Sequence, residues 1–531
     1  MKRALFFSPY GQWHYHGACE TTMGHALRAR GMEVQFIGCD GLFPACDVFR
    51  AATDKRTAAS CLGCQKTAAT LYEGMATPYQ WLGRHITPGI ETEIGSWLEE
   101  IPDEELLAAR YRGYPVGRWA RSSVHFHFRA SRLELADKEL VEGWREHILG
   151  CAVAIDGISR ILDDWRPDLL ILLNGRFFAH WAAIELAVER GIRVVTHERG
   201  MRAATLRFAE NGRVHDLTLF EQLWSLWGEV PLSRSELLWT NALLSDRRFG
   251  RGVPYLKYSP DPESEASVRE KLSLDERPIV AMFSSSDDEC AAFDERNVGA
   301  FDDSLEWLTA TVRAGAELPN LQFVVRLHPN LTREGINRQT MELAAELRSE
   351  APSNVRIVGP DEAISSYTVA DMAAVGVVYS STLGLEMAAG GQAVVSVARG
   401  WYGHAGFSRP VTSADEYLDA IASAAEQGLQ PEIARRAFRF AYRYFRELGR
   451  PFPWVREEPR HWGALTYRST DELTPGRDAA LDALCDMLRG KLPLLEPPKD
   501  SERSRSERDE DAFFAERLAI PTIPEHPRYA V

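Results

Sequence analysis

Residues 377–391, VVYSSTLGLEMAAGG, contain an apolar strand that passes through a short polar turn into a helix. The apolar run stops at Ser380 and Ser381, and Gly390 and Gly391 close the helical segment. A helix that begins directly after a strand presents free amides and hydroxyls at its N-terminus, where anions bind. The stretch therefore predicts a parallel α/β sheet with an anion site at its carboxyl edge.

The sequence on both sides of this stretch repeats the strand–helix alternation. In the second half of the chain, apolar strands are expected at 278–284, 321–328, 355–359, 375–380 and 393–398. In the first half they are expected at 4–9, 33–39, 168–174 and 193–198. Continuous apolar strands of this kind are typical of parallel sheets covered by helices on both faces. The chain is therefore predicted to form two doubly wound α/β domains.

The domain boundaries follow from breaks in this rhythm. The first domain is expected at 1–255 and contains a helical, cysteine-bearing insertion at about 40–148. The second domain is expected at 256–430, followed by C-terminal helices at 431–490 and a charged, Pro-rich tail at 491–531. Residues 228–275 are rich in Pro, Gly and Ser and are the predicted linker.

Composition excludes several classes of protein. The 531 residues are 45% hydrophobic and 26% charged, as in globular proteins. The 61 basic and 76 acidic residues give a net charge of −15, which argues against nucleic-acid partners. Because no apolar run approaches the roughly 18 residues of a membrane helix and the N-terminal apolar stretch is too short for a signal peptide, we expect a cytoplasmic protein.

The strand at 321–328 ends in RLHPN, which combines a basic residue, a histidine and a proline. Pro329 restricts the backbone and favours an extended conformation for His328. His328 then projects at the carboxyl edge of the sheet, where it can donate to a phosphate oxygen, with Arg326 beside it. The alternative is a histidine satisfied by backbone groups at a strand end.

Further anion-binding candidates follow the neighbouring strands. The hydroxyl groups that follow the strands at 278–284 and 375–380 can hydrogen-bond a phosphate. The carboxylate of Glu386 can accept from a ribose hydroxyl, and the ring of Tyr402 can stack on a base or a sugar. The alternatives are simple helix N-caps, a solvated carboxylate and ordinary loop packing. The candidates are Ser284, Ser285, Ser380, Ser381, Thr382, Glu386 and Tyr402.

The first domain offers a different chemistry. Glu198 lies near the end of the strand at 193–198, and a carboxylate in that place suits general acid/base work. The alternative for Glu198 is a structural ion pair. His14 is a second catalytic candidate, and four side chains in neighbouring loops are expected on the substrate side: Trp13, His16, Asn174 and Arg176.

Four cysteines are concentrated early in the chain. Cys39, Cys46, Cys61 and Cys64 have the spacing C-x6-C-x14-C-x2-C. Four thiolates with one C-x2-C pair suit a structural Zn, and the same ligands suit an iron–sulfur cluster. The alternative is a set of unrelated thiols with an accidental pair.

Common catalytic motifs are missing from the sequence. It contains no G-x-G-x-x-G, no P-loop, no G-x-S-x-G and no H-E-x-x-H. This argues against dehydrogenase, P-loop NTPase, α/β-hydrolase and zincin activities.

Residues 278–410 resemble the bacterial capsule-polysaccharide-synthesis glycosyltransferases, which include the Kdo transferases. The matching pieces are the His-Pro of RLHPN and the segment SSTLGLEMAAGGQAVVSVARGWYGHAG. The same His-Pro and Ser-Ser combination occurs in bacterial sialyltransferases and CDP-glycerol transferases. The resemblance implies a GT-B fold, with two Rossmann-like domains facing a central cleft. It also implies that His328, Ser380 and Ser381 contact the phosphate of a donor, most typically a CMP-sugar.

The resemblance further implies an acidic residue in the first domain that does acid/base work. Where relatives carry Glu/Asp-Asp-Gly, this chain has Glu198-Arg199-Gly200, so Glu198 is the best match. The expected function is transfer of a sugar from a nucleotide-activated donor to a glycan or glycolipid acceptor in surface polysaccharide synthesis, without a required catalytic metal. Peripheral attachment to the inner membrane and a homo-oligomer are compatible with this function.

Two alternative functions remain open at the level of sequence. The first keeps the fold and changes the reaction, to a sugar-nucleotide epimerase or hydrolase or to a CDP-glycerol-type polyol-phosphate transferase. The second is a non-catalytic carbohydrate- or metal-binding protein on a degenerate transferase scaffold.

Overall fold

The computed structural model describes residues 2–49, 56–251, 259–285, 299–333 and 336–519. These residues form two compact units. Unit 1 consists of the described residues within Met1–Phe128, Leu133–Asp216 and Leu448–Glu496, and unit 2 of those within Arg129–Arg132, Leu217–Glu447 and Pro497–Val531. The predicted domain boundary at 255–256 lies outside the described residues, as do residues 520–531 of the predicted tail.

Unit 1 is built on a seven-stranded sheet with the order β13-β6-β5-β4-β1-β2-β3. The strands from β1 to β5 pair in parallel, whereas β6 and β13 are antiparallel additions at one edge. The order 3-2-1-4-5-6 is that of the Rossmann fold. The strands are β1 (Arg3–Phe7), β2 (Glu33–Gly38), β3 (Tyr79–Trp81), β4 (Leu169–Leu173), β5 (Arg193–Arg199), β6 (Thr205–Glu210) and β13 (Arg450–Pro451).

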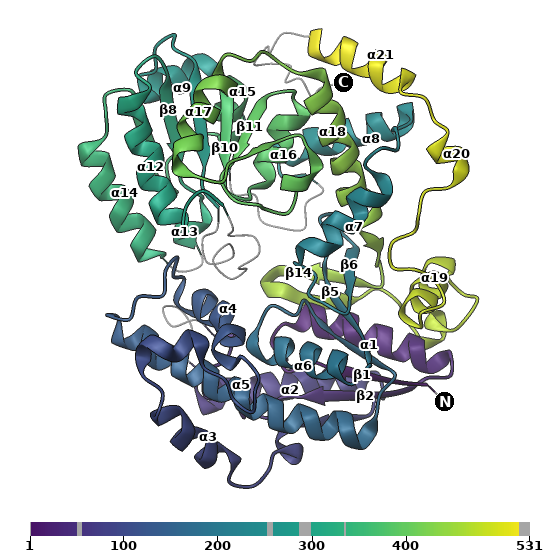
Figure 1. Cartoon of the computed structure of the whole chain (residues 1–531). Coiled ribbons are helices and arrows are strands. Elements are labelled where there is room, and N and C mark those ends of the chain that lie inside the picture. Colours follow the sequence, from purple (N-terminus) through teal and green to yellow (C-terminus); the bar gives the residue numbers. More distant parts are fainter. Residues whose placement is uncertain (1, 50–55, 252–258, 286–298, 334–335, 520–531) are drawn as a thin grey trace. The chain divides into compact units, whose positions relative to one another are not determined.

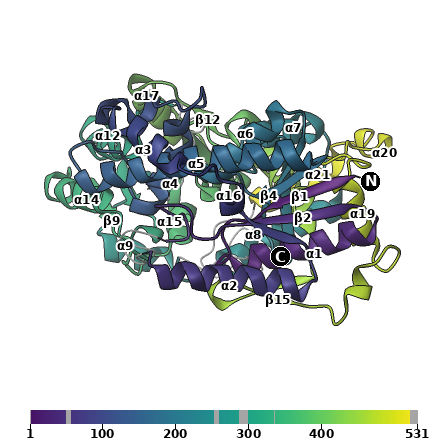
Figure 2. The same cartoon turned by 90° about the horizontal axis from the view of Figure 1, so that it is seen from below.

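Helices cover both faces of this sheet, with α1 and α2 on one face and α5 and α6 on the other (Figure 2). The longest, α5, begins where the Asp137 carboxylate accepts the backbone N–H of Leu140 and ends at Arg166 in the left-handed conformation. The helices are α1 (His14–Ala29), α2 (Ala58–Gly74), α3 (Ile90–Glu99), α4 (Val116–Phe128), α5 (Lys138–Trp165), α6 (Phe178–Glu189) and α19 (Ala479–Leu488).

Helices α2, α3, α4 and α5 lie between β2 and β4, where the first domain is predicted to contain a helical insertion. The same segment contains an unpredicted strand. The three residues of β3 pair with β2 at the sheet edge. A strand of three residues is too short to give an alternating pattern, which is why the sequence did not reveal it.

Unit 2 is built on a six-stranded, all-parallel sheet with the order β12-β11-β10-β7-β8-β9. This is again the 3-2-1-4-5-6 order, so both units are Rossmann-like, as predicted. The strands are β7 (Ile279–Phe283), β8 (Gln322–Arg326), β9 (Val355–Val358), β10 (Ala373–Val378), β11 (Ala393–Ser396) and β12 (Arg409–Pro410).

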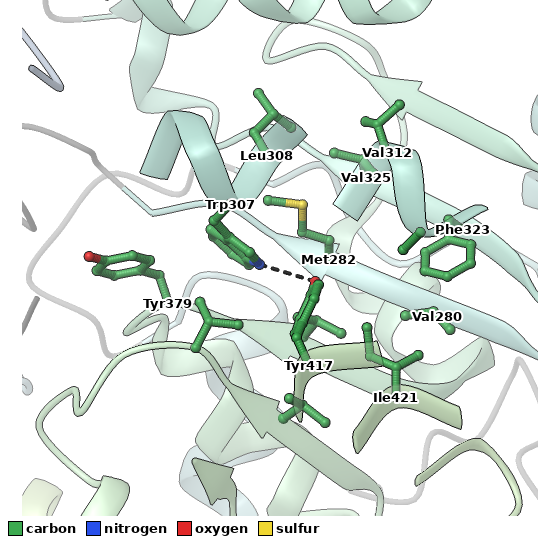
Figure 3. Close-up of a cluster of buried hydrophobic side chains, with 14 of the residues drawn as sticks. Val280, Met282, Trp307, Leu308, Val312, Phe323, Val325, Tyr379, Tyr417 and Ile421 are labelled. Carbon is green, nitrogen blue, oxygen red and sulfur yellow. Dashed lines mark hydrogen bonds between the residues drawn. The ribbon is translucent and has the colours of Figure 1, made fainter. Parts of the chain in front are cut away.

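The core of unit 2 lies between this sheet and the helices on one of its faces (Figure 3). Val280 of β7, Val325 of β8 and Trp307 belong to this core, and the Trp307 indole N–H donates to the Tyr417 hydroxyl at 3.1 Å. This hydrogen bond satisfies the polar atoms that these two large rings bring into the core. The helices of unit 2 are α7 (Leu217–Trp227), α8 (Arg234–Arg248), α9 (Glu265–Leu272), α12 (Ser304–Glu317), α13 (Asn330–Arg333), α14 (Arg338–Glu350), α15 (Ser366–Met372), α16 (Thr382–Ala389), α17 (Ala414–Ala425), α18 (Pro431–Tyr442), α20 (Asp500–Arg503) and α21 (Arg508–Ala519).

The predicted linker at 228–275 is wrong over part of its length, because it contains α8. Ser233 and Glu236 form a capping box in which each side chain accepts the other residue's backbone N–H. The buried residues Leu237 and Leu244 then anchor the helix within unit 2. The Ser-x-x-Glu signal was present in the sequence and outweighs the surrounding turn-forming residues.

The C-terminal part of the chain contributes to both units. After α18 and a π-helical turn at Arg443–Glu447, residues 448–496 belong to unit 1 and add β13, α19 and a hairpin of β14 (Val455–Glu458) and β15 (Trp462–Leu465). The chain then returns to unit 2, where α21 packs on α8 and α18 (Figure 1). Among the described residues, none of the helices is both long and apolar enough to span a membrane.

Candidate functional site

The carboxyl ends of three neighbouring strands in unit 2 bring the predicted donor residues to one sheet edge. Val378 at the end of β10 pairs with Phe283 of β7, and Phe283 pairs with Arg326 of β8. Ser380, Ser284 and His328 each follow one of these strands by one or two residues. The gap between β7 and β10 is the point where the strand order reverses, and ligands of doubly wound sheets bind outside such a point.

The ring of His328 is fixed by the backbone around it. Its Nδ1 accepts the N–H of Asn330 at 3.1 Å, and its own backbone N–H donates to the Ser284 hydroxyl at 2.8 Å. Because Nδ1 accepts a hydrogen bond, the neutral ring carries its proton on Nε2. His328 is half-buried at the sheet edge, and its Nε2–H is the kind of donor that a phosphate oxygen accepts.

The turn between β10 and α16 is held in place by two aromatic residues. The Trp401 indole N–H donates to the carbonyl of Ser380 at 2.9 Å, and the Tyr402 hydroxyl donates to the carbonyl of Ser381 at 2.7 Å. The Ser381 hydroxyl caps α16 by accepting the N–H of Leu383 at 3.3 Å. The turn and the first amides of α16 thus keep a fixed position at the positive end of the helix dipole.

Three predicted donor residues are buried in contacts within the protein. The Arg326 guanidinium donates to backbone carbonyls of the loop after β9, among them that of Gly359. The Glu386 carboxylate accepts from Arg247 Nε at 3.0 Å. Tyr402 is almost fully buried beneath the Ser-Ser turn. These three side chains support the edge of the sheet from inside the fold.

Ser285 has a different environment. Its side chain is 8% exposed, and its hydroxyl has no hydrogen-bond partner within the part of the chain that the structure describes. A buried hydroxyl without a partner costs about 1–3 kcal/mol. A ligand oxygen at the β7–β10 switch point would provide that partner. Thr382 is the first residue of α16 and is partly exposed at the same turn.

Gly384, in the first turn of α16, has no room for a side chain. A Cβ at this position would lie 2.4 Å from the Tyr402 hydroxyl and 2.9 Å from Val378. We expect Gly384→Ala to displace Tyr402 from the Ser381 carbonyl and to lower the free energy of unfolding by about 1–3 kcal/mol. Urea unfolding of the variant measures this change. Gly403, where a Cβ meets nothing within 4 Å, provides the control, and an equal loss in Gly403→Ala would contradict the explanation.

In unit 1, the structure brings three of the predicted residues together around one carboxylate. Glu198 lies within β5, which continues to Arg199, and its Oε2 accepts the amide N–H of Asn174 at 2.8 Å. Its Oε1 accepts the backbone N–H of Arg199 at 2.8 Å and lies 3.5 Å from His16 Nε2. Glu198, Asn174 and His16 therefore form one buried polar group at the ends of β4 and β5.

The environment sets the charge of this group. Burial raises the pKa of the Glu198 carboxyl, but attraction to His16, Arg199 and His215 and the hydrogen bond from Asn174 outweigh burial, so that the pKa lies well below its usual range. Burial lowers the pKa of His16 well below its usual value. Since a buried imidazole with a strongly lowered pKa is neutral, we attribute the ionised state of Glu198 mainly to Arg199 and the hydrogen bonds. The pair is a carboxylate beside a neutral imidazole at neutral pH.

A second carboxylate–histidine pair lies next to the first. His197 Nε2 and Glu20 Oε1 are 2.9 Å apart, and both side chains are almost fully buried. The rings of His197 and His16 have centroids 6.0 Å apart. The sequence did not point to Glu20, because it lies mid-helix in α1 and is distant in sequence from His197.

The remaining predicted residues of unit 1 lie in two neighbouring places. His14 stacks on Trp462, with ring centroids 3.4 Å apart, and its Nδ1 accepts the N–H of Gly463. Trp13 packs against Phe177, and the guanidinium of Arg176 lies over the same ring. Burial lowers the pKa of His14, so that this ring is also neutral at neutral pH.

One basic residue at the His-Pro loop was not predicted from the sequence. Arg129 belongs to unit 2, and its guanidinium donates to the carbonyl of Asn330 at 2.8 Å. The adjacent Ser131 donates its backbone N–H to the Gln339 side-chain oxygen, and the Arg132 carbonyl accepts the Gln339 amide N–H. No local pattern marks a residue that reaches the loop from 201 positions away in the chain.

The four-cysteine metal site predicted from spacing is not shown by the described part of the chain. No three His, Cys, Asp or Glu side chains there form a group that could hold a metal ion. The thiols of Cys39, Cys46 and Cys64 each accept from backbone N–H groups and lie close enough to influence one another's pKa, and Cys61 and Cys64 are one turn apart within α2. Burial raises the pKa of the Cys39 thiol to about 11, which opposes the thiolate that a metal needs.

Comparison with known proteins gives only distant structural likenesses. The sequence matches no protein-family model and no curated protein. The solved structures that resemble it include a UDP-GlcNAc 2-epimerase from Neisseria meningitidis, at 11% identity over 84% of this chain and 98% of that one, with a TM-score of 0.27. They also include KpsC of Thermosulfurimonas dismutans, a beta Kdo 2,4 transferase, at 15% identity over 58% of this chain and 87% of that one, with a TM-score of 0.34. A third is the glycosyltransferase SnogD from Streptomyces nogalater, at 13% identity over 83% and 95% of the two chains, with a TM-score of 0.26. TM-scores this low assign neither a function nor a substrate to this chain.

Proposed function

We propose that this chain is a glycosyltransferase of the GT-B type that transfers a sugar from a nucleotide-activated donor to a glycan or glycolipid acceptor. The observation that carries the proposal is the edge of unit 2. There His328 offers Nε2–H as a donor beside the hydroxyls of Ser284 and Ser285 and the capped turn at the start of α16. Such donors suit the phosphate of a nucleotide sugar.

Donor binding is assigned to unit 2 and acceptor activation to unit 1. When the bond between the anomeric carbon and the phosphate oxygen breaks, negative charge grows on the leaving phosphate. His328 and the amides of α16 stabilise that charge by hydrogen bonding and by the helix dipole. Arg129 adds a positive charge at the His-Pro loop.

Acceptor activation falls to Glu198 and His16. A hydroxyl attacks the anomeric carbon only if its proton is removed as the new bond forms. An ionised carboxylate next to a neutral imidazole accepts a proton at neutral pH. Because the Glu198 carboxyl is ionised, it is better suited to act as the general base than as the general acid.

The nucleotide is proposed to be CMP, because the His-Pro and Ser-Ser motifs resemble enzymes that use CMP-sugars. The proposed setting is surface polysaccharide synthesis. The test incubates the protein with CMP- and UDP-sugars, with and without a capsule-type oligosaccharide acceptor. Nucleotide release that requires the acceptor supports the transferase, whereas donor consumption without an acceptor identifies the epimerase or hydrolase alternative. Absence of any reaction with every donor would favour the non-catalytic alternative.

Substitution of His328 tests the donor site directly. We expect His328→Ala to lower kcat/KM by about 10²–10³-fold, because one preorganised donor to the leaving phosphate is lost. His328→Gln keeps an amide N–H near the position of Nε2 and should retain part of the activity. His85→Ala, in the insertion of unit 1, is the control. Full activity of His328→Ala would contradict the assignment of the donor site to this edge of the sheet.

A further inference from the structure

Trp462 is a large aromatic residue that the fold leaves exposed. It begins β15 in unit 1, and 51% of the side chain is accessible to solvent. Burial of a tryptophan side chain is strongly favourable, so an exposed one that is also held rigidly marks a contact surface.

The orientation of the indole is fixed from one side. The His14 ring lies against it at a centroid distance of 3.4 Å and an angle of 10°, and the Gly463 N–H donates to His14 Nδ1 at 2.9 Å. Gly463 has no space for a side chain, since a Cβ would lie 2.9 Å from Tyr15 Cα and Ala18 Cβ. The β14–β15 hairpin is therefore pressed onto α1. Because His14 covers one face of the half-exposed indole, we infer that the exposed part of the residue includes the opposite face.

Polar groups with hydrogen-bonding capacity border the indole. The preceding residue, His461, is 63% exposed at its side chain and has a φ of 57°, which is uncommon for a residue other than glycine. Its ring is held by Glu457 at 2.8 Å, and Arg199 pairs with the same glutamate at 3.0 Å. Backbone strain next to an exposed aromatic ring is a feature of ligand-binding sites.

The position of this surface relates it to the proposed base. His14 and His16 share the first turn of α1, and His16 lies 3.5 Å from the Glu198 carboxylate. Arg199, the neighbour of Glu198 in β5, joins the hairpin through Glu457. The β14–β15 hairpin and Glu198 are thus connected within unit 1 through α1 and through the Arg199–Glu457 ion pair.

We propose that the open face of Trp462 is a carbohydrate subsite, on which a pyranose ring of the acceptor stacks while His461, Glu457 and Arg199 bind its hydroxyls. An aromatic face suits the C–H face of a sugar ring, and the surrounding donors and acceptors suit its hydroxyl groups. This proposal rests on the proposed transferase function and specifies its acceptor as a pyranose-containing glycan.

The test measures glycan binding separately from nucleotide binding. The full chain is applied to an array of pyranose oligosaccharides, and the best ligand is titrated calorimetrically against the wild type, Trp462→Ala, Trp462→Phe and Leu465→Ala. We expect Trp462→Ala to weaken binding about tenfold or more and Trp462→Phe to weaken it less, because phenylalanine keeps an aromatic face. Leu465, exposed in the same strand, is the matched control and should leave binding unchanged.

The outcomes separate the two proposals. Unchanged glycan binding by Trp462→Ala, or no binding of any pyranoside by the wild type, overturns the subsite. A thermal shift with CMP that disappears in Trp462→Ala also overturns it, because the indole would then bind the nucleotide. If no nucleotide shifts the wild type while the glycan response depends on Trp462, the subsite stands and the transferase function fails.

Discussion

Replacing Glu198 by glutamine is expected to lower kcat by about 10²–10⁴-fold, the range for loss of a general base. Glutamine keeps the size of the side chain and can still pair with Asn174, so that the local structure is retained. It lacks the negative charge that accepts the proton of the acceptor hydroxyl. Steady-state kinetics with saturating donor measure the loss.

The matched control is Glu210→Gln, in the neighbouring strand β6. Glu210 pairs with Arg193 at a partly exposed position and has no part in the proposed reaction. We expect its activity to stay within twofold of the wild type, roughly the effect of losing an exposed ion pair. Equal activity of Glu198→Gln and the wild type would contradict the proposal that Glu198 is the general base.

The pKa directions also predict the pH dependence. The pKa of Glu198 is held below its usual value of about 4.3, and that of His16 below about 6.5. A carboxyl with a lowered pKa stabilises the fold above its ordinary pKa, and this contribution is lost as the pH falls through the lowered value. With both pKa values lowered in this way, neither group changes its charge between about pH 6 and 8. We therefore expect that titration of this pair does not reduce kcat as the pH is lowered within that range.

The second large effect concerns stability. Replacing Glu510 by alanine is expected to lower the free energy of unfolding of unit 2 by about 3–5 kcal/mol, because the buried Arg439 loses its fully buried carboxylate partner and keeps the half-exposed Glu507. The Glu510 carboxylate, fully buried in α21, accepts two hydrogen bonds from Arg439, at 2.9 and 2.6 Å. It also accepts the backbone N–H of Leu232 at 2.8 Å.

Chemical denaturation followed by circular dichroism measures this loss. Glu516→Ala is the matched control, since Glu516 lies in the same helix and makes an exposed pair with Arg234. The control should change stability by less than about 1 kcal/mol. If both variants lose the same small amount, the docking of α21 does not stabilise unit 2 through this pair.

The sequence predicted the sheets well because their strands are continuous apolar runs. It also predicted that His328, Ser284 and Ser380 share an edge, since the carboxyl ends of parallel strands meet there. It predicted the wrong environment for Arg326, Glu386 and Tyr402, which contact carbonyls, Arg247 and the Ser-Ser turn inside the fold. Residue type and position at a strand end do not reveal whether a long side chain turns outward or folds back.

Contacts between distant segments explain what else was missed. The Trp462–His14 stack joins residues almost 450 positions apart, and Arg129 reaches Asn330 from a loop between two helices of the insertion. The cysteine pattern misled for a related reason. Spacing specifies which thiols can meet but not whether they meet in a metal-binding geometry, and no such group forms among the described residues.

The central claim is that the carboxyl edge of unit 2 binds the phosphate of a nucleotide. Isothermal titration with CMP tests it directly, using the wild type, His328→Ala and Glu198→Gln. We predict that the wild type and Glu198→Gln bind CMP equally well and that His328→Ala binds it at least about tenfold more weakly, as expected for the loss of a hydrogen bond to a charged group. Equal affinity of His328→Ala and the wild type, or no binding of CMP, UDP, GDP or CDP by the wild type, would contradict the claim.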